Sequence, residues 1–211
     1  MNQPKGSSPG VPSWDERYNG DLYVYGEEAN LFLQEAARTI PAQSRVAAYA
    51  EGEGRNAVFL AKLGHEVTAY DYAQAGLRKT EALAVKNGVQ VRTVHADLIE
   101  DELPVERYDA AVMIFGHFPG KDQYRVLDKI LGSLKPGGRL LTEVYEKTQI
   151  DYGTGGPKDA DWLYDAAELL AWGKRLRLKH FFAGEAERTE GLYHSGVCHV
   201  VQMVAEKPDL T

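Results

Sequence analysis

The chain has 211 residues, 44% of them hydrophobic and 26% charged, with a formal net charge of -7 at pH 7. This suits one globular domain. The acidic balance, without any basic run, argues against DNA or RNA as a partner, because nucleic-acid backbones are bound by clusters of Lys and Arg. No apolar stretch reaches the roughly 18 residues of a membrane span. The single cysteine, Cys198, excludes disulfide scaffolds and cysteine-rich zinc sites. We therefore expect a cytoplasmic protein that binds no metal and enters no membrane.

The N-terminal residues differ in composition from the rest of the chain. Residues 1–13 are rich in Gly, Pro and Ser and lack an apolar signal core, so we expect a mobile tail there. Residues 14–211 should form a single domain. Within residues 14–44, a turn comes first, and apolar side chains spaced as on one face of a helix follow it. That helix should end at Pro41.

From residue 45 the chain alternates short apolar strands with amphipathic helices, which is typical of a parallel, doubly wound sheet with helices on both faces. The predicted strands are residues 45–50, 66–71, 89–97, 108–115 and 139–146. The predicted helices are residues 55–64, 75–88 and 123–138, the last closed by a Pro-Gly-Gly stop.

The pattern changes after residue 146. Residues 147–162 form a Gly-rich loop, which we expect on the side where a substrate enters, and residues 159–173 read as a helix. Residues 175–191 and 196–208 read as two long strands, with an antiparallel pairing and a turn that contains His194. The predicted fold is thus α/β: a doubly wound, mostly parallel sheet that ends in a C-terminal antiparallel hairpin.

A glycine turn lies between the first predicted strand and the following helix. Gly52, Gly54 and Ala57 form a Gly-x-Gly-x-x-Ala run, in which glycine permits a tight turn and a close approach to a ligand. Asp71 ends the next predicted strand, where a carboxylate can hold the hydroxyl groups of a ribose. The arrangement predicts a ligand that contains a nucleoside.

Two acidic residues inside the turn, Glu51 and Glu53, indicate which nucleoside ligand this is. A pyrophosphate would lie close to both carboxylates. Like charges a few Å apart repel by about 1 kcal/mol in water and by several at a lower effective dielectric. The turn contains no lysine, and Arg55 is its only cation. A ligand without phosphate and with a positive centre reverses the sign of the interaction. We therefore predict S-adenosylmethionine, whose parts are adenine, ribose, a sulfonium and an amino acid.

Asp97 follows the third predicted strand and precedes Leu98. A carboxylate there can accept a hydrogen bond from the adenine amino group, while the N–H of the next residue reaches a ring nitrogen. An aspartate that caps a helix would explain the position equally well. Two other functions stay open. A nicotinamide-dependent oxidoreductase would use Gly52, Gly54 and Asp71 in the same way, and a regulatory protein could bind S-adenosylmethionine without catalysis.

Several motifs together resemble the class I S-adenosylmethionine-dependent methyltransferases, and within them the tellurite-resistance and thiopurine-methyltransferase-like group. The matching stretches are WDERY from Trp14, YVYG from Tyr23, AEGEGRNAVFLA from Ala50, GHEVTAYD from Gly64, ADL from Ala96 and LKPGG from Leu134.

The resemblance implies a seven-stranded sheet of order 3-2-1-4-5-7-6. It implies that the methionine part of the cofactor lies over residues 50–54, the ribose at Asp71 and the adenine at Asp97 and Leu98. It also implies an N-terminal segment that closes over the cofactor. Many relatives carry an acid where this chain has Ala48, so which carboxylate holds the cofactor's amino group stays open. The cofactor-binding residues expected on this basis are Trp14, Arg17, Tyr25, Ala50, Glu51, Gly52, Gly54, Asn56, Asp71, Tyr72, Asp97, Leu98 and Phe115.

The methyl acceptor is expected to be a small molecule, because little chain remains for a second recognition domain. The resemblance favours a soft nucleophile such as a thiol or a chalcogen oxyanion, which needs no base. A neutral O–H or N–H acceptor would need one, for which His117 and His194 are the candidates. Tyr145, Tyr152 and Tyr193 could line the acceptor pocket. The chain could act as a monomer or a homodimer.

Overall fold

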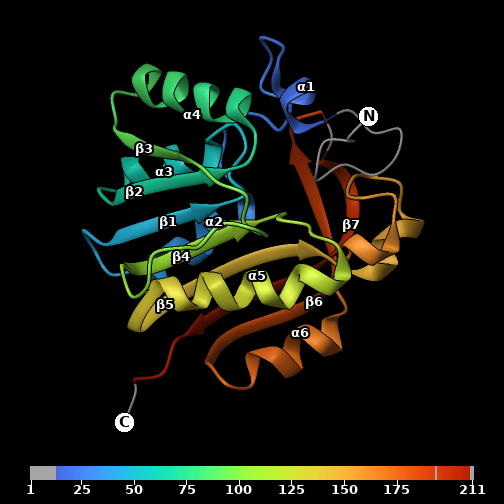
Figure 1. Cartoon of the computed structure of the whole chain (residues 1–211). Helices are drawn as coiled ribbons and strands as arrows, with labels where there is room; N and C mark the ends of the chain where they lie inside the picture. The colour runs from blue at the N-terminus through green and yellow to red at the C-terminus, as the bar shows by residue number, and fades with distance from the viewer. Residues whose placement is uncertain (1–12, 193, 210–211) are drawn as a thin grey trace.

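A seven-stranded sheet crosses the molecule in the computed structural model, which describes residues 13–192 and 194–209 (Figure 1). The strand order is β3-β2-β1-β4-β5-β7-β6. Strands β1 to β5 pair in parallel, whereas β7 pairs antiparallel with both β5 and β6. The predicted fold class and the strand order that the resemblance implied are both confirmed.

The strands begin and end within a few residues of the predicted limits. Strand β4 is buried almost throughout because it lies in the middle of the sheet with helices on both sides. The bounds are β1 Arg45–Tyr49, β2 Glu66–Asp71, β3 Val91–His95, β4 Tyr108–Ile114, β5 Leu134–Tyr145, β6 Arg177–Glu190 and β7 His194–Glu206.

Helices cover both faces of the sheet (Figure 1). Apolar side chains of α2 and α3 pack on one face, and those of α5 and α6 pack on the other. The α-helices are α1 Trp14–Tyr18, α2 Leu31–Ala36, α3 Arg55–Lys62, α4 Gln74–Lys86, α5 Gly120–Ser133 and α6 Ala166–Gly173. Short 3-10 helices are η1 Ala37–Thr39, η2 Lys147–Asp151 and η3 Ala160–Trp162.

Two element boundaries differ from the sequence prediction by five residues or more. Residues 134–138 belong to β5 and do not extend α5, because Gly137 N–H donates to the carbonyl of Lys207 and Lys207 N–H donates to that of Gly138. The predicted helix over residues 159–173 begins only at Ala166. Tyr164 interrupts it by pairing its backbone with Tyr145 and Lys147 at the end of β5.

The N-terminal segment packs against α4. Ser13 caps α1, and the carboxylate of Asp15 accepts the N–H of Ala75 at 2.8 Å. Residues 1–12, most of the predicted tail, lie outside the described residues. The helix that we predicted before Pro41 is present as α2 and η1.

Candidate functional site

The candidate site lies at the carboxyl ends of β1 and β4. These two strands are neighbours, but the helices that follow them, α3 and α5, lie on opposite faces of the sheet. In open α/β sheets, ligands bind at such a point of divergence, outside the carboxyl ends of the strands. Ala50 and Phe115, the first residues beyond the two strands, have positive φ angles of 51° and 56°. A left-handed conformation is strained in residues other than glycine and is most often found at functional sites.

The glycine turn that follows Ala50 is packed tightly between α1 and α4. Gly52 and Gly54 have φ angles of 65° and 92°, which glycine adopts readily. A Cβ atom on Gly52 would lie 2.8 Å from Oη of Tyr18, and one on Gly54 would lie 2.6 Å from Cα of Thr80. The two glycines are therefore required by neighbouring protein atoms as well as by the turn itself.

Asp71, at the end of β2, joins two backbone segments. Its Oδ2 accepts the N–H of Gly52 at 2.8 Å, and its Oδ1 accepts the N–H of Ala73 at 2.7 Å. The side chain is buried, and burial raises the pKa of its carboxyl group although both hydrogen bonds act in the opposite direction. The carboxylate thus fixes the glycine turn against the end of β2.

Glu51 is a second buried carboxylate at the turn. Its Oε1 accepts the N–H of Ala57 at 2.7 Å, in the first turn of α3. Burial raises the pKa of this carboxyl group to about 7, although the hydrogen bond to Ala57 and the charge of Arg55 act to lower it. A positive group of a ligand beside Glu51 would stabilise its ionised form.

The other glutamate of the turn is neutralised within the protein. Nζ of Lys79, from α4, lies 2.7 Å from Oε1 of Glu53, and the N–H of Tyr25 donates to Oε2 at 3.3 Å. The argument from two uncompensated glutamates was therefore wrong for Glu53, because the compensating lysine comes from another helix. The negative charge available to a ligand at this turn comes from Glu51 and Asp71.

The segment that we predicted as a lid is docked on the turn and on α4. Nζ of Lys79 also donates to the carbonyl of Leu22 at 2.7 Å, and Oη of Tyr23 donates to the carbonyl of Lys79 at 3.1 Å. Nη1 of Arg17 donates to Oη of Tyr25 at 2.9 Å, and the ring of Trp14 stacks on Tyr18. Trp14, Arg17 and Tyr25, all predicted to bind the cofactor, thus belong to one segment that packs beside the glycine turn.

The remaining predicted cofactor residues have protein partners of their own. Oδ1 of Asn56 accepts the N–H of Asn30 at 3.0 Å, which connects α3 to α2. Oδ1 of Asp97 accepts the N–H of Ile99 at 2.9 Å, so this aspartate does cap the turn that follows β3. Leu98 packs in the core, and Tyr72 stays partly exposed beside His95.

An aromatic cluster lies next to Phe115 at the same edge of the sheet. The ring of Phe115 lies 4.5 Å from that of Tyr145 and 4.4 Å from that of His194, and Tyr25 lies 4.5 Å from His194. His117 stacks on the other side of Tyr145 at 5.6 Å. The cluster joins the end of β4, the end of β5, the start of β7 and the N-terminal segment.

The two candidate bases differ in their surroundings. Nδ1 of His117 lies 2.9 Å from the carbonyl oxygen of Trp162, and the N–H of Tyr145 donates to its Nε2 at 3.4 Å. Burial lowers the pKa of His117 to about 4. His194 is the first residue of β7 and is buried, so its predicted place in the hairpin turn was wrong. Burial, helped by the charge of Arg55, holds the pKa of His194 well below its usual range.

Two polar atoms of the aromatic cluster have no hydrogen-bond partner among the described residues. They are Oη of Tyr145 and Nδ1 of His194, both fully buried. Buried polar groups are normally paired, so each of these atoms calls for a partner such as a water molecule or a ligand group. Of the other tyrosines expected near an acceptor, Tyr152 instead donates to Glu185 at 2.8 Å, and Tyr193 lies outside the described residues.

Sequence reasoning missed Tyr18 and Lys79, which hold the turn. Tyr18 stands in the WDERY stretch, and that stretch was the available signal. Lys79 carries no such signal, because one lysine on an amphipathic helix looks like any other.

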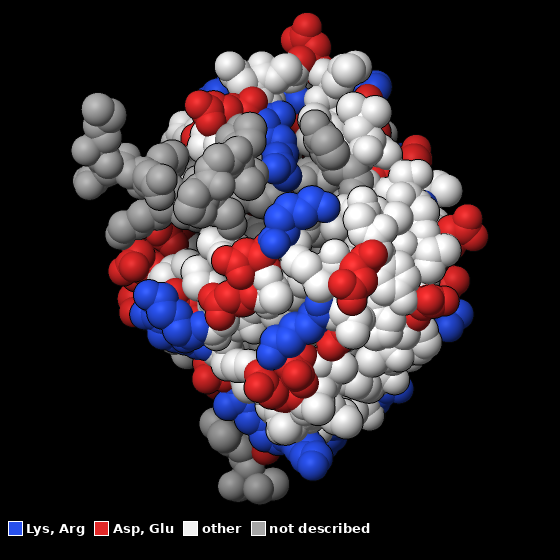
Figure 2. Space-filling view, turned by 90° about the vertical axis from the view of Figure 1, so that its right-hand side faces the viewer, with Lys and Arg blue, Asp and Glu red and all other residues white. Residues whose placement is uncertain are grey.

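Figure 2 shows the surface that forms the right-hand side of the molecule in Figure 1. Lys and Arg side chains alternate there with Asp and Glu, so the described part of this face is neither wholly basic nor wholly acidic. Over residues 13–192 and 194–209 no His, Cys, Asp and Glu side chains gather in a group of three or more that could hold a metal ion. Within the same ranges no helix has the length and apolar character to cross a membrane.

Residues 46–138 match the model of a family described as a methyltransferase domain. Two curated relatives are named demethylmenaquinone methyltransferase. The protein from Clavibacter sepedonicus is 30% identical over 100 residues, which is 47% of this chain and 40% of the relative. The protein from Thermus thermophilus is 31% identical over 126 residues, which is 59% of this chain and 54% of the relative. The matched parts thus span about half of the relatives' length.

Solved structures share the fold over most of the chain. TehB from Haemophilus influenzae has a TM-score of 0.71 at 18% identity, covering 92% of this chain and 65% of that one. A protein described as converting a disulfide bond into a thioacetal group during echinomycin biosynthesis has a TM-score of 0.74 at 15% identity, covering 94% and 91%. A Methanosarcina mazei structure titled as an S-adenosylmethionine-dependent methyltransferase has a TM-score of 0.68 at 15% identity, covering 86% and 99%. The domain match and the relatives support an S-adenosylmethionine-dependent methyltransferase, and S-adenosylmethionine is the cofactor that such a domain implies.

Proposed function

We propose that this chain transfers a methyl group from S-adenosylmethionine to a small acceptor that is a soft nucleophile, such as a thiol or a chalcogen oxyanion. The observation that carries the proposal is the pair of buried carboxylates, Glu51 and Asp71, at the glycine turn beside the carboxyl ends of β1 and β4. Neither residue forms an ion pair with a cation within 4 Å among the described residues, and burial raises the pKa of both. A ligand with cationic sulfonium and amino groups fits such a turn, whereas a pyrophosphate does not.

The residues fit the parts of that cofactor. Glu51 lies where the cationic amino group can be held, and Asp71 can accept ribose hydroxyls with lone pairs that its two backbone bonds leave over. The bound cofactor supplies the electrophilic methyl group. The chain itself holds the turn, aligns the acceptor and excludes water with the docked segment around Tyr25.

The lowered pKa of both histidines makes them weak bases and so supports an acceptor that is already ionised. His117 uses both ring nitrogens in contacts with backbone groups, and its pKa of about 4 makes it a poor base. His194 is likewise held neutral. Oη of Tyr145 and Nδ1 of His194 are the unpaired atoms that could instead hydrogen-bond to the acceptor. We also propose a cytoplasmic location and a monomer or homodimer, in line with one buried free cysteine, Cys198.

Isothermal titration calorimetry tests the cofactor. We expect S-adenosylmethionine and its demethylated product to bind with dissociation constants in the micromolar range, and NAD not to bind. Binding of NAD with no heat from either adenosyl compound would support the oxidoreductase alternative and reject this proposal.

A panel of acceptors tests the acceptor class, with formation of S-adenosylhomocysteine as the measurement. We expect turnover with a small thiol, selenite or tellurite. A demethylmenaquinone-type quinol is included because both curated relatives are named for that acceptor. Turnover of the quinol alone would favour this second candidate. Cofactor binding without turnover of any acceptor would favour the regulatory alternative.

The raised pKa of Glu51 leads to a prediction about pH. The cofactor's amino group favours the ionised carboxylate, so binding must first remove the proton that Glu51 keeps below its pKa of about 7. Affinity for S-adenosylmethionine should therefore rise with pH, by at least about tenfold from pH about 5.5 to about 7.5, and then level off. Calorimetry across this range measures it.

The control for this prediction is Glu51→Gln, which keeps the shape but cannot ionise. The variant should bind more weakly at pH about 7.5 and should lose most of the pH dependence. A dependence that survives unchanged in Glu51→Gln would mean that another group titrates and that Glu51 does not hold the amino group.

A further inference from the structure

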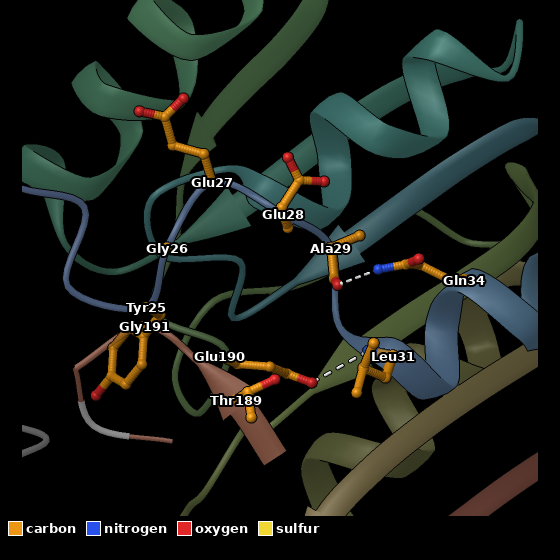
Figure 3. A pocket seen from close by; sticks show the side chains of 10 residues that line it. All are labelled: Tyr25, Gly26, Glu27, Glu28, Ala29, Leu31, Gln34, Thr189, Glu190 and Gly191. Carbon is orange, nitrogen blue, oxygen red and sulfur yellow. Dashed lines mark hydrogen bonds between the residues drawn. The ribbon is translucent and has the colours of Figure 1, made fainter. Parts of the chain in front are cut away.

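Glu190, the last residue of β6, lies where three segments of the chain meet, and the proposed reaction does not use its side chain directly. Its Oε2 lies 2.7 Å from Nη1 of Arg55, the first residue of α3. Its Oε1 accepts the N–H of Leu31 and a hydrogen bond from Nδ2 of Asn30, each at 3.1 Å. Figure 3 shows the side chain reaching from the hairpin towards the start of α2. One carboxylate thus connects the hairpin, the start of α2 and the helix after the glycine turn.

The network around Glu190 is buried and balanced in charge. Glu143, inside β5, pairs with Arg188 and accepts hydrogen bonds from Asn30 at 2.8 Å and Gln202 at 2.6 Å. The side chains of both glutamates and of Arg55 and Arg188 are at most 6% exposed. Two carboxylates and two guanidinium groups therefore compensate one another, and removing the charge of one leaves a buried partner without its counter-ion.

The end of the hairpin that Glu190 holds also carries the acceptor side of the site. In the register of β6 and β7, Glu190 lies opposite His194. The next residue, Gly191, packs so closely that a Cβ on it would lie 2.4 Å from the carbonyl carbon of Tyr25. Leu192 N–H donates to the carbonyl of Val24 at 2.9 Å. The hairpin end, defined here as residues 188–192 and 194–197, thus contains His194 and is joined to the N-terminal segment.

Between these contacts the two segments are separated by a pocket of about 330 Å³. Figure 3 shows residues 25–31 on one side of it and residues 189–191 on the other. Across this pocket Glu190 accepts hydrogen bonds from Leu31 and Asn30, and Arg55 contacts both Glu190 and the carbonyl of Glu28, so these contacts help to fix the relative position of the two segments.

We propose that Glu190 is a positioning residue that couples the cofactor's turn to the hairpin end, so that a cofactor bound at Gly52–Gly54 orders the acceptor side through Arg55 and Glu190. This inference rests on the proposed function. Arg55 follows Gly54 directly in the chain. A turn that the cofactor holds in place therefore restrains the backbone of Arg55, whose guanidinium group pairs with Glu190. The hairpin end then holds His194 and Tyr25 in place around the acceptor.

Hydrogen exchange with and without saturating S-adenosylhomocysteine tests the coupling in three proteins: the wild type, Glu190→Gln and the control Glu206→Gln. Glu206 also makes several ion pairs, with Arg139, Arg177 and Lys179, but it lies at the far end of the same hairpin. In the wild type and the control we expect slower exchange, by at least about fivefold, both in the glycine turn and in the hairpin end. In Glu190→Gln the turn should still be protected, whereas the hairpin end should not.

A merely structural role predicts a different result. It would lower the melting temperatures of both variants while leaving cofactor-induced protection of the hairpin end intact. If Glu190→Gln does not fold, Arg55→Lys replaces it, because the lysine keeps the charge but not the two-sided contact of Arg55 with Glu190 and the carbonyl of Glu28.

Equal protection of the hairpin end in the wild type and in the variant would overturn the coupling, as would a wild type that binds S-adenosylhomocysteine without protecting that end. A wild type that gives no calorimetric heat with either adenosyl compound would instead reject the proposed function, and this inference with it.

Discussion

Replacing Asp71 by asparagine is expected to weaken S-adenosylmethionine binding by at least about a hundredfold. The reason is that the two proposed hydrogen bonds from the ribose hydroxyls lose their charged acceptor, and such charge-assisted bonds contribute roughly 1.5–3 kcal/mol each. The amide can accept only one of the two N–H groups, of Gly52 and Ala73, that the carboxylate now accepts. Its NH2 group would face the other donor, so the glycine turn should also lose its fixed position against β2. Calorimetry at pH about 7.5 measures the change.

Asp109→Asn is the matched control for this experiment. Asp109 likewise accepts a backbone N–H, from Arg45 at 2.8 Å, but it lies at the amino ends of β1 and β4, at the other end of these strands from the glycine turn. Its replacement should leave cofactor binding unchanged. If Asp71→Asn folds and binds as tightly as the wild type, Asp71 only ends a strand and has no part in holding the ribose.

The second large effect is expected from Gly54→Ala. The φ angle of 92° is strained for alanine, and the added Cβ would lie 2.6 Å from Cα of Thr80, a backbone atom of α4 that cannot move aside alone. We expect the free energy of unfolding to fall by about 2–4 kcal/mol, from strain and overpacking together, and S-adenosylmethionine binding to be lost. Urea unfolding and calorimetry measure the two effects.

Gly64→Ala separates the strain from the contact. Gly64 has nearly the same φ angle, 91°, but nothing lies within 4 Å of the position of its Cβ. The free energy of unfolding should fall by about 1–2 kcal/mol, and cofactor binding should stay. Equal losses of stability in the two variants, with binding kept in both, would show that α4 does not restrain the turn.

The secondary structure was predictable where the signal is local. The alternation of apolar strands and amphipathic helices, Gly64 after α3 and Pro41 after η1 depend on periodicity and on turn chemistry within a few residues. The predicted ends of helices were wrong where contacts with distant segments of the chain determine them. Residues 134–138 read as a helix stop, but the backbone of Lys207 draws them into β5. Tyr164 interrupts a predicted helix because it pairs with the end of β5.

The cofactor side of the candidate site was predictable in part for the same reason. The turn after one strand and the last residue of the next parallel strand lie together at the carboxyl end of a doubly wound sheet. Topology alone therefore brings Gly52 and Asp71 together. The partner of Glu53 was not predictable, because Lys79 stands on a separate helix and no spacing marks it.

By itself, the sequence determined the fold class, the glycine turn and the position of Asp71, because each depends on residues close together in the chain or on a general rule of parallel sheets. Only the tertiary structure decided which charges face a ligand and which residues surround the acceptor. Glu53 is neutralised from α4, His194 is buried by Phe115 and Tyr25, and Glu190 is tied to Arg55. Such pairings depend on distances between segments far apart in the chain, and burial then sets the strength of each charge interaction.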